Sequence, residues 1–244
     1  MPFLNSVSGT LGVLGTRKGS SDGQIVTSSL RLSLEAFNPS SYSGSGPTWF
    51  DLSGNGFNAT LVNSPSFSAD GMGSIVLDGA NDYISLATSG FGAASLSLEW
   101  WIKKTAGDVD GYIHVTDSSD NPETRFTMNT TNFGAAIYDA GAYRWTGNVA
   151  TITTDTWYHA VATITNGSQK FYVNGVETAT NSGYYDGSSG GNIGEHTIGT
   201  YNRPGAGYGG YFAGKIAAYR YYTKVLTPQE VIQNFNARKW RFGL

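Results

Sequence analysis

The sequence predicts an all-β fold: a two-sheet antiparallel sandwich with one short C-terminal helix and an extended N-terminal arm. Three observations predict it. Of 244 residues, 33 are glycine, 14% are charged and 14% are aromatic, a composition typical of strands joined by tight turns. Short runs of alternating apolar and polar residues recur from about residue 31 onward. Only one stretch, near the C-terminus, has a clear helical pattern.

The run LSLEWWIK, residues 96–103, shows the strand alternation most clearly. Leu96, Leu98, Trp100 and Ile102 fall on one face of such a strand, and the residues between them fall on the other. Gly, Asn, Asp or Ser separates most of the remaining runs, as expected for strands linked by turns. Further strands are expected at residues 74–78, 83–86, 111–116, 124–128, 135–138, 143–146, 157–164, 169–174, 176–180, 195–199 and 214–222.

Residues 157–180 contain two Asn-Gly pairs. Asn and Gly tolerate the positive φ angles that a two-residue type I′ turn requires, so Asn174-Gly175 is expected to join two strands directly. The segment Asn166-Gly167-Ser168 is expected to form a second hairpin with one more loop residue. A three-stranded meander with a structural role follows from this pattern.

The stretch LTPQEVIQNFNARKW predicts a helix over residues 228–238. Thr227 suits the N-cap, Pro228 the first helical position, and Glu230 completes a capping box. An apolar stripe is expected from Val231, Ile232 and Phe235. We expect this single helix to pack against the sandwich and hold it closed rather than to form a layer of its own.

Six stretches, taken in order, resemble one family. They are WFDLSGNGFNATLVNSP (49–65), IVLDGANDYISL (75–86), SLSLEWWIK (95–103), WYHAVATITNGSQKFYVNGV (157–176), HTIGTYN (196–202) and GYFAGKIAAYRYYTKVLTPQEVIQNFNARKWRFG (210–243). Together they resemble the laminin-G-like branch of the concanavalin A-like lectin/glucanase jelly rolls. The resemblance implies a jelly-roll domain at residues 31–244 behind an arm at residues 1–30. It implies less about function, because lectins, glycosidase modules and adhesion domains share this sandwich.

The ending YYTKVLTPQEVIQNFNARKWRFG, residues 221–243, resembles the tail of such domains in bacteriophage structural proteins. Cysteine is absent, and Arg17 and Lys18 follow the apolar stretch of the N-terminus, which is the wrong order for a secretory signal. We therefore expect a virion protein made in the host cytoplasm, as a capsid decoration (cement) protein or a tail or fibre component. Residues 1–30 are expected to dock on other virion proteins in a homo-oligomeric or multicopy assembly.

Charge and hydropathy exclude two classes of partner. The formal net charge is −3, and the 15 Lys and Arg residues are scattered, so no basic patch for nucleic acid is expected. No run of about 18 apolar residues is present, so no membrane span is expected.

The sequence favours a protein without catalytic activity. Glycosidases of this superfamily need paired carboxylates on one strand, and the equivalent-looking strand offers Glu99 alone, beside Ser97 and Trp101. One carboxylate cannot supply both the acid and the nucleophile, which leaves a polysaccharide depolymerase as the less favoured alternative. His114, His159 and His196 show no metal-ligand spacing, so structural or surface roles are expected for them.

No cofactor is required by this interpretation. Oxygen ligands for calcium are available at Asp108, Asp110, Asp117 and Asp120, but none of these segments matches a complete calcium loop. Relatives often carry acidic residues after the GKI strand start, where Ala217 and Ala218 stand here. This departure argues against calcium.

Aromatic residues in Gly-rich loops are the candidate ligand-binding residues. A sugar can stack its C–H face on an aromatic ring while flanking polar groups bond its hydroxyls, and loops at one end of a sandwich commonly bind ligands. A protein interface, which the same residue types suit, is slightly favoured for a particle protein, and host surface glycans bound by an adhesin module are the alternative. The candidates are Tyr143, Arg144, Trp145, Tyr184, Tyr185, Asp186, Tyr201, Asn202, Arg203 and Tyr208.

Overall fold

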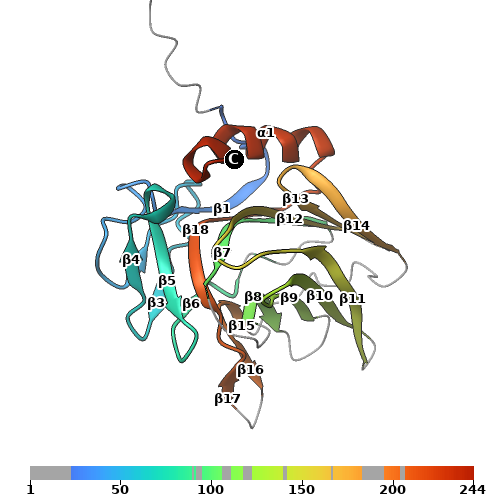
Figure 1. The fold of residues 1–244 in the computed structure, drawn as a ribbon, viewed down its shortest axis with the longest axis horizontal. Coiled ribbons are helices and arrows are strands. Elements are labelled where there is room, and N and C mark those ends of the chain that lie inside the picture. Colours follow the sequence, from blue (N-terminus) through green and yellow to red (C-terminus); the bar gives the residue numbers. More distant parts are fainter. Residues whose placement is uncertain are drawn as a thin grey trace, which may run out of the picture.

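Two antiparallel sheets pack face to face, and helix α1 (Pro228–Arg238) lies across the outer face of one of them (Figure 1). The computed structural model describes residues 23–89, 91, 95–105, 111–117, 123–139, 142–165, 167–182, 195–203 and 207–244. The predicted all-β sandwich with a short C-terminal helix is confirmed. Most of the predicted arm, residues 1–22, lies outside the described residues.

Sheet A has β18 near its centre. Its order is β14-β13-β12-β7-β18-β5-β4, and β1 also pairs with β18, beyond the end of β5. The bounds of its strands are β1 Leu30–Glu35, β4 Ser66–Ser68, β5 Ser74–Asp78, β7 Leu96–Lys104, β12 Trp157–Thr165, β13 Ser168–Val173, β14 Val176–Ser182 and β18 Ala213–Tyr222.

Sheet B forms the opposite wall, in the order β11-β10-β9-β8-β15-β6-β3-β2. A separate two-stranded hairpin, β16–β17, follows β15 in the chain and projects from this side of the molecule (Figure 1). The bounds are β2 Thr48–Trp49, β3 Ala59–Val62, β6 Tyr83–Ser85, β8 Gly111–Asp117, β9 Glu123–Met128, β10 Asn132–Asp139, β11 Ala142–Thr151, β15 Glu195–Ile198, β16 Tyr201–Arg203 and β17 Gly207–Gly209.

The alternation in β7 places its residues as predicted. Leu98, Trp100 and Ile102 join the core between the sheets, whereas Trp101 packs under the C-terminal segment. Trp101 stacks on Phe242 of the short helix η2 (Lys239–Phe242), with ring centroids 4.1 Å apart. Both faces of this central strand are therefore buried.

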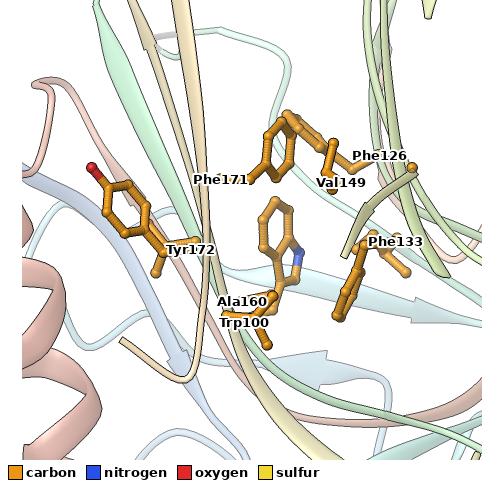
Figure 2. A pocket seen from close by; sticks show the side chains of 11 residues that line it. Trp100, Phe126, Phe133, Val149, Ala160, Phe171 and Tyr172 are labelled. Carbon is orange, nitrogen blue, oxygen red and sulfur yellow. The ribbon is translucent and has the colours of Figure 1, made fainter. Parts of the chain in front are cut away.

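The core is closely filled around Trp100. Its indole points between the sheets toward Phe126, Phe133 and Phe171, whereas Tyr172 points to the other side of β13 (Figure 2). The remaining space beside Trp100 is a cavity of about 10 Å³, too small for a ligand. The described residues around Trp100 thus form a packing core.

The Asn174-Gly175 turn is confirmed. Val173 pairs with Val176, and both turn residues have the positive φ angles of a type I′ turn, 51° and 82°. The other loop is one residue shorter than predicted, because Thr165 pairs directly with Ser168. Asn166 itself lies outside the described residues.

Helix α1 begins as predicted. Thr227 accepts a hydrogen bond from the Glu230 amide at 3.2 Å, and the Glu230 carboxylate accepts one from the Thr227 amide at 2.9 Å. The predicted apolar stripe is wrong at Ile232, whose side chain is 46% exposed. The buried face is made instead by Val231, Asn234 and Ala237.

Residues 23–30 pack on this same layer of the molecule. The Val26 amide donates to Asn234 Oδ1 at 2.8 Å, and the Val26 side chain is buried beside Val231. No helix of the described chain is long and apolar enough to cross a membrane.

Candidate functional site

The β16–β17 hairpin brings two predicted ligand-binding tyrosines together. Asn202 pairs with Tyr208, and Tyr201 pairs with Gly209. Because residues paired directly across two strands share a face, Tyr201 and Tyr208 lie on opposite faces of the hairpin. The two rings therefore meet different neighbours in sheet B.

Tyr201 fixes the hairpin against the sheet. Its ring packs edge-on against Tyr112 of β8, with centroids 4.5 Å apart. The Arg125 guanidinium of β9 lies 5.2 Å from the centroid of the Tyr201 ring and 5.6 Å from that of Tyr112. Arg125 is only 4% exposed, so this cation–π contact is largely shielded from water.

Glycine allows this close approach. A Cβ added at Gly210 would lie 2.4 Å from the Tyr112 ring and 2.7 Å from the Tyr201 ring. The Tyr112 amide donates to the Gly210 carbonyl at 3.0 Å, and Thr200 Oγ1 donates to the Gly209 carbonyl at 2.9 Å. In the sequence TYNRPGAGYGG, Gly209 and Gly210 thus let the backbone lie directly on aromatic rings.

Tyr208 faces the solvent from the other side of the hairpin. It is 44% exposed, and its ring stacks on Tyr83 of β6 with centroids 4.9 Å apart and an interplanar angle of 25°. The stacking holds the ring on one side, and Tyr208 keeps part of its surface in contact with solvent. We name Tyr83, Tyr112, Arg125, Tyr201 and Tyr208 the hairpin cluster.

The other predicted ligand-binding residues are placed only in part. Tyr143, Arg144 and Trp145 occupy β11 and pair through their backbones with Tyr138, Ile137 and Ala136, but their side chains lie outside the description. The same is true of the side chains of Asn202 and Arg203. Tyr184, Tyr185 and Asp186 lie outside the described residues altogether.

The calcium candidates are likewise described only in part or not at all. Asp108, Asp110 and Asp120 lie outside the described residues, and Asp117 is described only by its backbone in β8. Among the described side chains, no group of three or more His, Asp or Glu residues could hold a metal ion.

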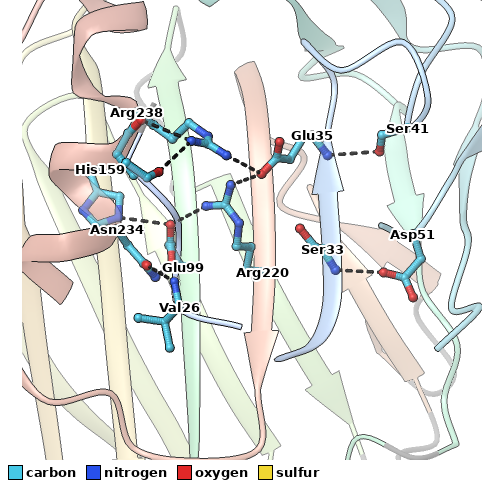
Figure 3. A network of polar contacts seen from close by, with 12 residues as sticks. Val26, Ser33, Glu35, Ser41, Asp51, Glu99, His159, Arg220, Asn234 and Arg238 are labelled. Carbon is cyan, nitrogen blue, oxygen red and sulfur yellow. Dashed lines mark hydrogen bonds and ion pairs between the residues drawn. The ribbon is translucent and has the colours of Figure 1, made fainter. Parts of the chain in front are cut away.

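Glu99 belongs to a buried polar cluster beside α1 (Figure 3). This cluster shares no residue with the hairpin cluster. Arg220 donates to Glu99 Oε1 at 2.5 Å and forms a second ion pair with Glu35 of β1. Asn234 of α1 donates to Glu99 Oε2 at 2.6 Å, and His159 Nε2 lies 3.2 Å from Glu99 Oε1. These contacts join sheet A, β1 and the C-terminal helix in one network.

Electrostatics keep the Glu99 carboxyl ionised. Burial alone would raise its pKa, but the Arg220 charge, the His159 imidazole and the Asn234 amide together hold the pKa at about 2. Glu99 is 0% exposed, so it meets no surface groove. A carboxylate that is buried, paired and ionised is suited to holding elements together.

His196 is a second buried histidine, located on β15 between the sheets. Its Nδ1 lies 3.3 Å from the Ala87 carbonyl oxygen, and its ring packs edge-on against Phe91 with centroids 4.8 Å apart. Burial lowers the pKa of His196 to about 3, with the Ala87 carbonyl opposing that shift. His159 and His196 thus have the structural surroundings expected from the sequence, whereas the His114 side chain lies outside the description.

Sequence reasoning missed Tyr83, Tyr112 and Arg125 as site residues. The alternation offered a partial signal, since each adjoins a core residue (Ile84, Ile113 and Phe126) and so must face outward. The packing of a hairpin from residues 201–209 onto these strands has no local signal.

Comparisons with known proteins agree with this architecture. Domain 4 of AbnA, a GH43 extracellular arabinanase from Geobacillus stearothermophilus solved with arabinotriose, is similar with a TM-score of 0.69 and 20% identity, covering 84% of this chain and 97% of that one. The receptor-binding domain of botulinum neurotoxin C/D mosaic serotype has a TM-score of 0.67 and 14% identity, and the binding domain of Paraclostridial Mosquitocidal Protein 1 has 0.65 and 15%. The alignments cover 87% and 86% of this chain, but only 52% of each toxin chain.

At these identities the likeness shows the fold. None of the curated proteins matches the sequence. The family model described as the concanavalin A-like lectin/glucanases superfamily (Laminin_G_3) matches residues 78–232, more than half of the chain. The matched residues include β7, β12 and β18 of sheet A and both strands of the hairpin. This chain therefore belongs to the concanavalin A-like lectin/glucanase superfamily.

Proposed function

We propose that this protein is a glycan-binding module without catalytic activity, and that its hairpin cluster contacts the sugar. The carrying observation is the Tyr208 ring, which is 44% exposed and held by stacking on Tyr83. A sugar ring packs its C–H groups against such an aromatic face, and the electron-rich ring favours those hydrogens.

Within the hairpin cluster, one residue would contact the sugar and the others hold the hairpin in place. Tyr201, Tyr112 and Arg125 hold the hairpin on the sheet, so the exposed Tyr208 ring loses little freedom when a ligand binds. One exposed ring gives modest affinity, and a dissociation constant near 1 mM corresponds to about −4 kcal/mol. Display of many copies on one surface would raise this to firm adhesion through effective concentration.

Replacing Tyr208 with Ala tests the proposal. We expect binding on a multivalent glycan array to fall by at least about tenfold, because the exposed stacking face is lost. Tyr208→Phe should retain binding if stacking dominates. Phe50→Ala removes another exposed ring, 49% accessible, and should leave binding unchanged. Arabinotriose belongs in the panel, since the similar arabinanase domain was solved with it. A wild-type protein silent on the whole array would contradict the proposal.

The absence of catalysis is part of the same proposal. Its support is that Glu99, the carboxylate on the strand where glycosidases of this superfamily carry a pair, is fully buried and bonded to Arg220 and Asn234. Incubation with host-type polysaccharides should release no reducing sugar. Release that disappears in Glu99→Gln, with the fold retained, would instead support a depolymerase.

We further propose a place on a bacteriophage particle, as a capsid decoration or tail component. Its support is the resemblance carried by residues 221–243, together with a sequence free of cysteine. Antibody labelling of purified particles tests it: labelled capsids or tails support the proposal, and unlabelled particles from cells that express the protein contradict it.

A further inference from the structure

A surface cleft lies at the side of the sandwich where the two sheets end. β4 is the last strand of sheet A on that side, and β2 is the last strand of sheet B. The loop before β2 and the loop between β3 and β4 enclose a cleft of about 380 Å³. This volume lies within the usual range for small-molecule sites, roughly 300–1,000 Å³. The cleft shares no residue with the hairpin cluster.

The walls of the cleft combine aromatic surface with hydroxyl groups. Phe67 is 40% exposed, and its ring lies 5.8 Å from that of the buried Tyr42. Ser45, Ser64 and Ser66 line the same cleft and are exposed. One exposed ring with several hydroxyls and backbone carbonyls at its rim matches the two sides of a sugar, one rich in C–H groups and one rich in hydroxyls.

The lining is electrically neutral. No Asp, Glu, Lys, Arg or His is among the described residues that line the cleft. The Tyr42 hydroxyl donates a hydrogen bond to the Gly46 carbonyl at 2.9 Å, and burial raises the pKa of Tyr42, so that it stays protonated. A charged ligand would find no opposite charge among these residues, which favours a neutral one.

The backbone of the cleft is held in a constrained shape. Asn63 and Ser64 are consecutive non-glycine residues with φ angles of 67° and 74°, a conformation that costs free energy. The Asn63 side chain donates to the Asn81 carbonyl at 2.7 Å, and the Leu61 amide donates to the Pro47 carbonyl at 2.7 Å. Both enclosing loops are therefore fixed before any ligand arrives, as preorganised binding sites are.

From these observations we propose that the cleft is a second binding site, which takes a neutral mono- or disaccharide unit stacked on Phe67. The three serines bond its hydroxyls. Together with the hairpin cluster, this site would let one molecule hold two sugar units of a surface glycan.

Two-dimensional ¹H–¹⁵N NMR titration separates the two sites in one experiment. The probes are arabinotriose, maltose and cellobiose, with glucuronic acid as the charged comparison. We expect at least one neutral probe to shift the amides of Ser64, Ser66 and Phe67 saturably, and glucuronic acid to shift them less. Phe67→Ala should raise the dissociation constant measured from the Ser64 and Ser66 shifts at least about tenfold. Tyr208→Ala should leave that dissociation constant unchanged.

Phe50→Ala is the matched control, because Phe50 is another exposed phenylalanine, 49% against 40% for Phe67, and lies outside the cleft lining. Ser66→Ala provides a milder variant if Phe67→Ala disturbs the fold. The proposal is overturned if no neutral probe shifts these amides at about 50 mM, or if Phe67→Ala and Phe50→Ala weaken the shifts equally. The amides of the hairpin report binding at the hairpin cluster, and those of Ser64, Ser66 and Phe67 report binding at the cleft. The experiment therefore shows for each site separately whether it binds sugar.

Discussion

Arg220 is fully buried between the carboxylates of Glu99 and Glu35. Removing it would leave two buried negative charges near one guanidinium, that of Arg238, which lies 3.8 Å from Glu35. We expect Arg220→Met to lower the free energy of unfolding by about 3–5 kcal/mol, the usual cost of breaking a buried ion pair from one side. Urea denaturation at pH 7 measures it.

The exposed pair Lys170–Glu177 gives the comparison. Its nitrogen and oxygen lie 2.9 Å apart, similar to the buried pairs, but both side chains are more than a third exposed. Lys170→Met should therefore lower the free energy of unfolding far less than Arg220→Met does, because water screens an exposed pair. Equal losses in the two variants would show that the buried cluster does not hold the layers together.

His196 makes stability depend on pH. The ordinary pKa of a histidine side chain is 6.5, and burial lowers that of His196 to about 3 in the folded protein, so between these values the unfolded chain binds the extra proton. Unfolding is then favoured as pH falls, and the free energy of unfolding should decrease by about 1.4 kcal/mol per pH unit below pH 6.5. Glu99 adds a loss of the same sign only below its ordinary pKa of 4.5.

The range from pH 6.5 to 5 lies above the ordinary pKa of Glu99, so the Glu99 contribution is absent there. Urea denaturation across this range should give a steep dependence for the wild type and a flatter one for His196→Gln, whatever the variant loses at pH 7. Parallel curves for the two proteins would mean that His196 takes up its proton within the folded state.

At the scale of elements, the position of the β16–β17 hairpin depends on Gly210. Gly210→Ala would force the Tyr112 and Tyr201 rings apart, and should cost about 1–3 kcal/mol as an overpacked contact does. Gly207→Ala is the matched control: its φ of 80° is also positive, but a Cβ there meets nothing within 4 Å. Gly210→Ala should also reduce glycan binding more than Gly207→Ala does. If the two variants lose stability and binding equally, the loss comes from the positive φ angle alone and not from contact with the two rings.

The longer strands and the helix were predictable because their signals are local. β5 matches its predicted range, and the capping box defined the start of α1. Six strands were missed: β1, β2, β3, β4, β16 and β17. β2, β4, β16 and β17 are two or three residues long, too few to show a periodicity, whereas the alternation of LRLSLE in β1 was overlooked. Asn234 was missed as a core position because a polar residue on the buried face of a helix breaks the apolar pattern; its partner, Glu99, lies 135 residues away.

The candidate site was predictable to a smaller extent. Tyr201 and Tyr208 stood out as aromatic residues in Gly-rich sequence, and the structure brings both into one hairpin. Their different roles could not be predicted, because Tyr201 owes its anchoring to Tyr112 and Arg125, and Tyr208 owes its stacking to Tyr83. These contacts depend on which strands neighbour β15 in sheet B, and the sequence pattern does not specify that order.

At the scale of the whole molecule, residues 23–29 are attached to the domain through helix α1. Residues 23–29 belong to the layer over sheet A: the Val26 amide bonds Asn234, the Gln24 carbonyl accepts from Gln233, and the Gly23 carbonyl accepts from Arg238. Residues engaged in this way are part of the domain itself. If the arm docks on a particle, residues 1–22 must supply the contacts.

Two deletions test the role of these contacts. Removing residues 1–22 keeps the contacts of residues 23–29 and should therefore lower the free energy of unfolding less than removing residues 1–29 does. Removing residues 1–29 exposes the buried face of α1 and deprives Asn234 Oδ1 of its donor, which should cost about 3 kcal/mol or more. On purified particles, the shorter deletion should already abolish incorporation although the domain remains folded. Normal incorporation without residues 1–22 would refute docking through them, and equal stability of the two deletions would show that the contacts of residues 23–29 do not stabilise the domain.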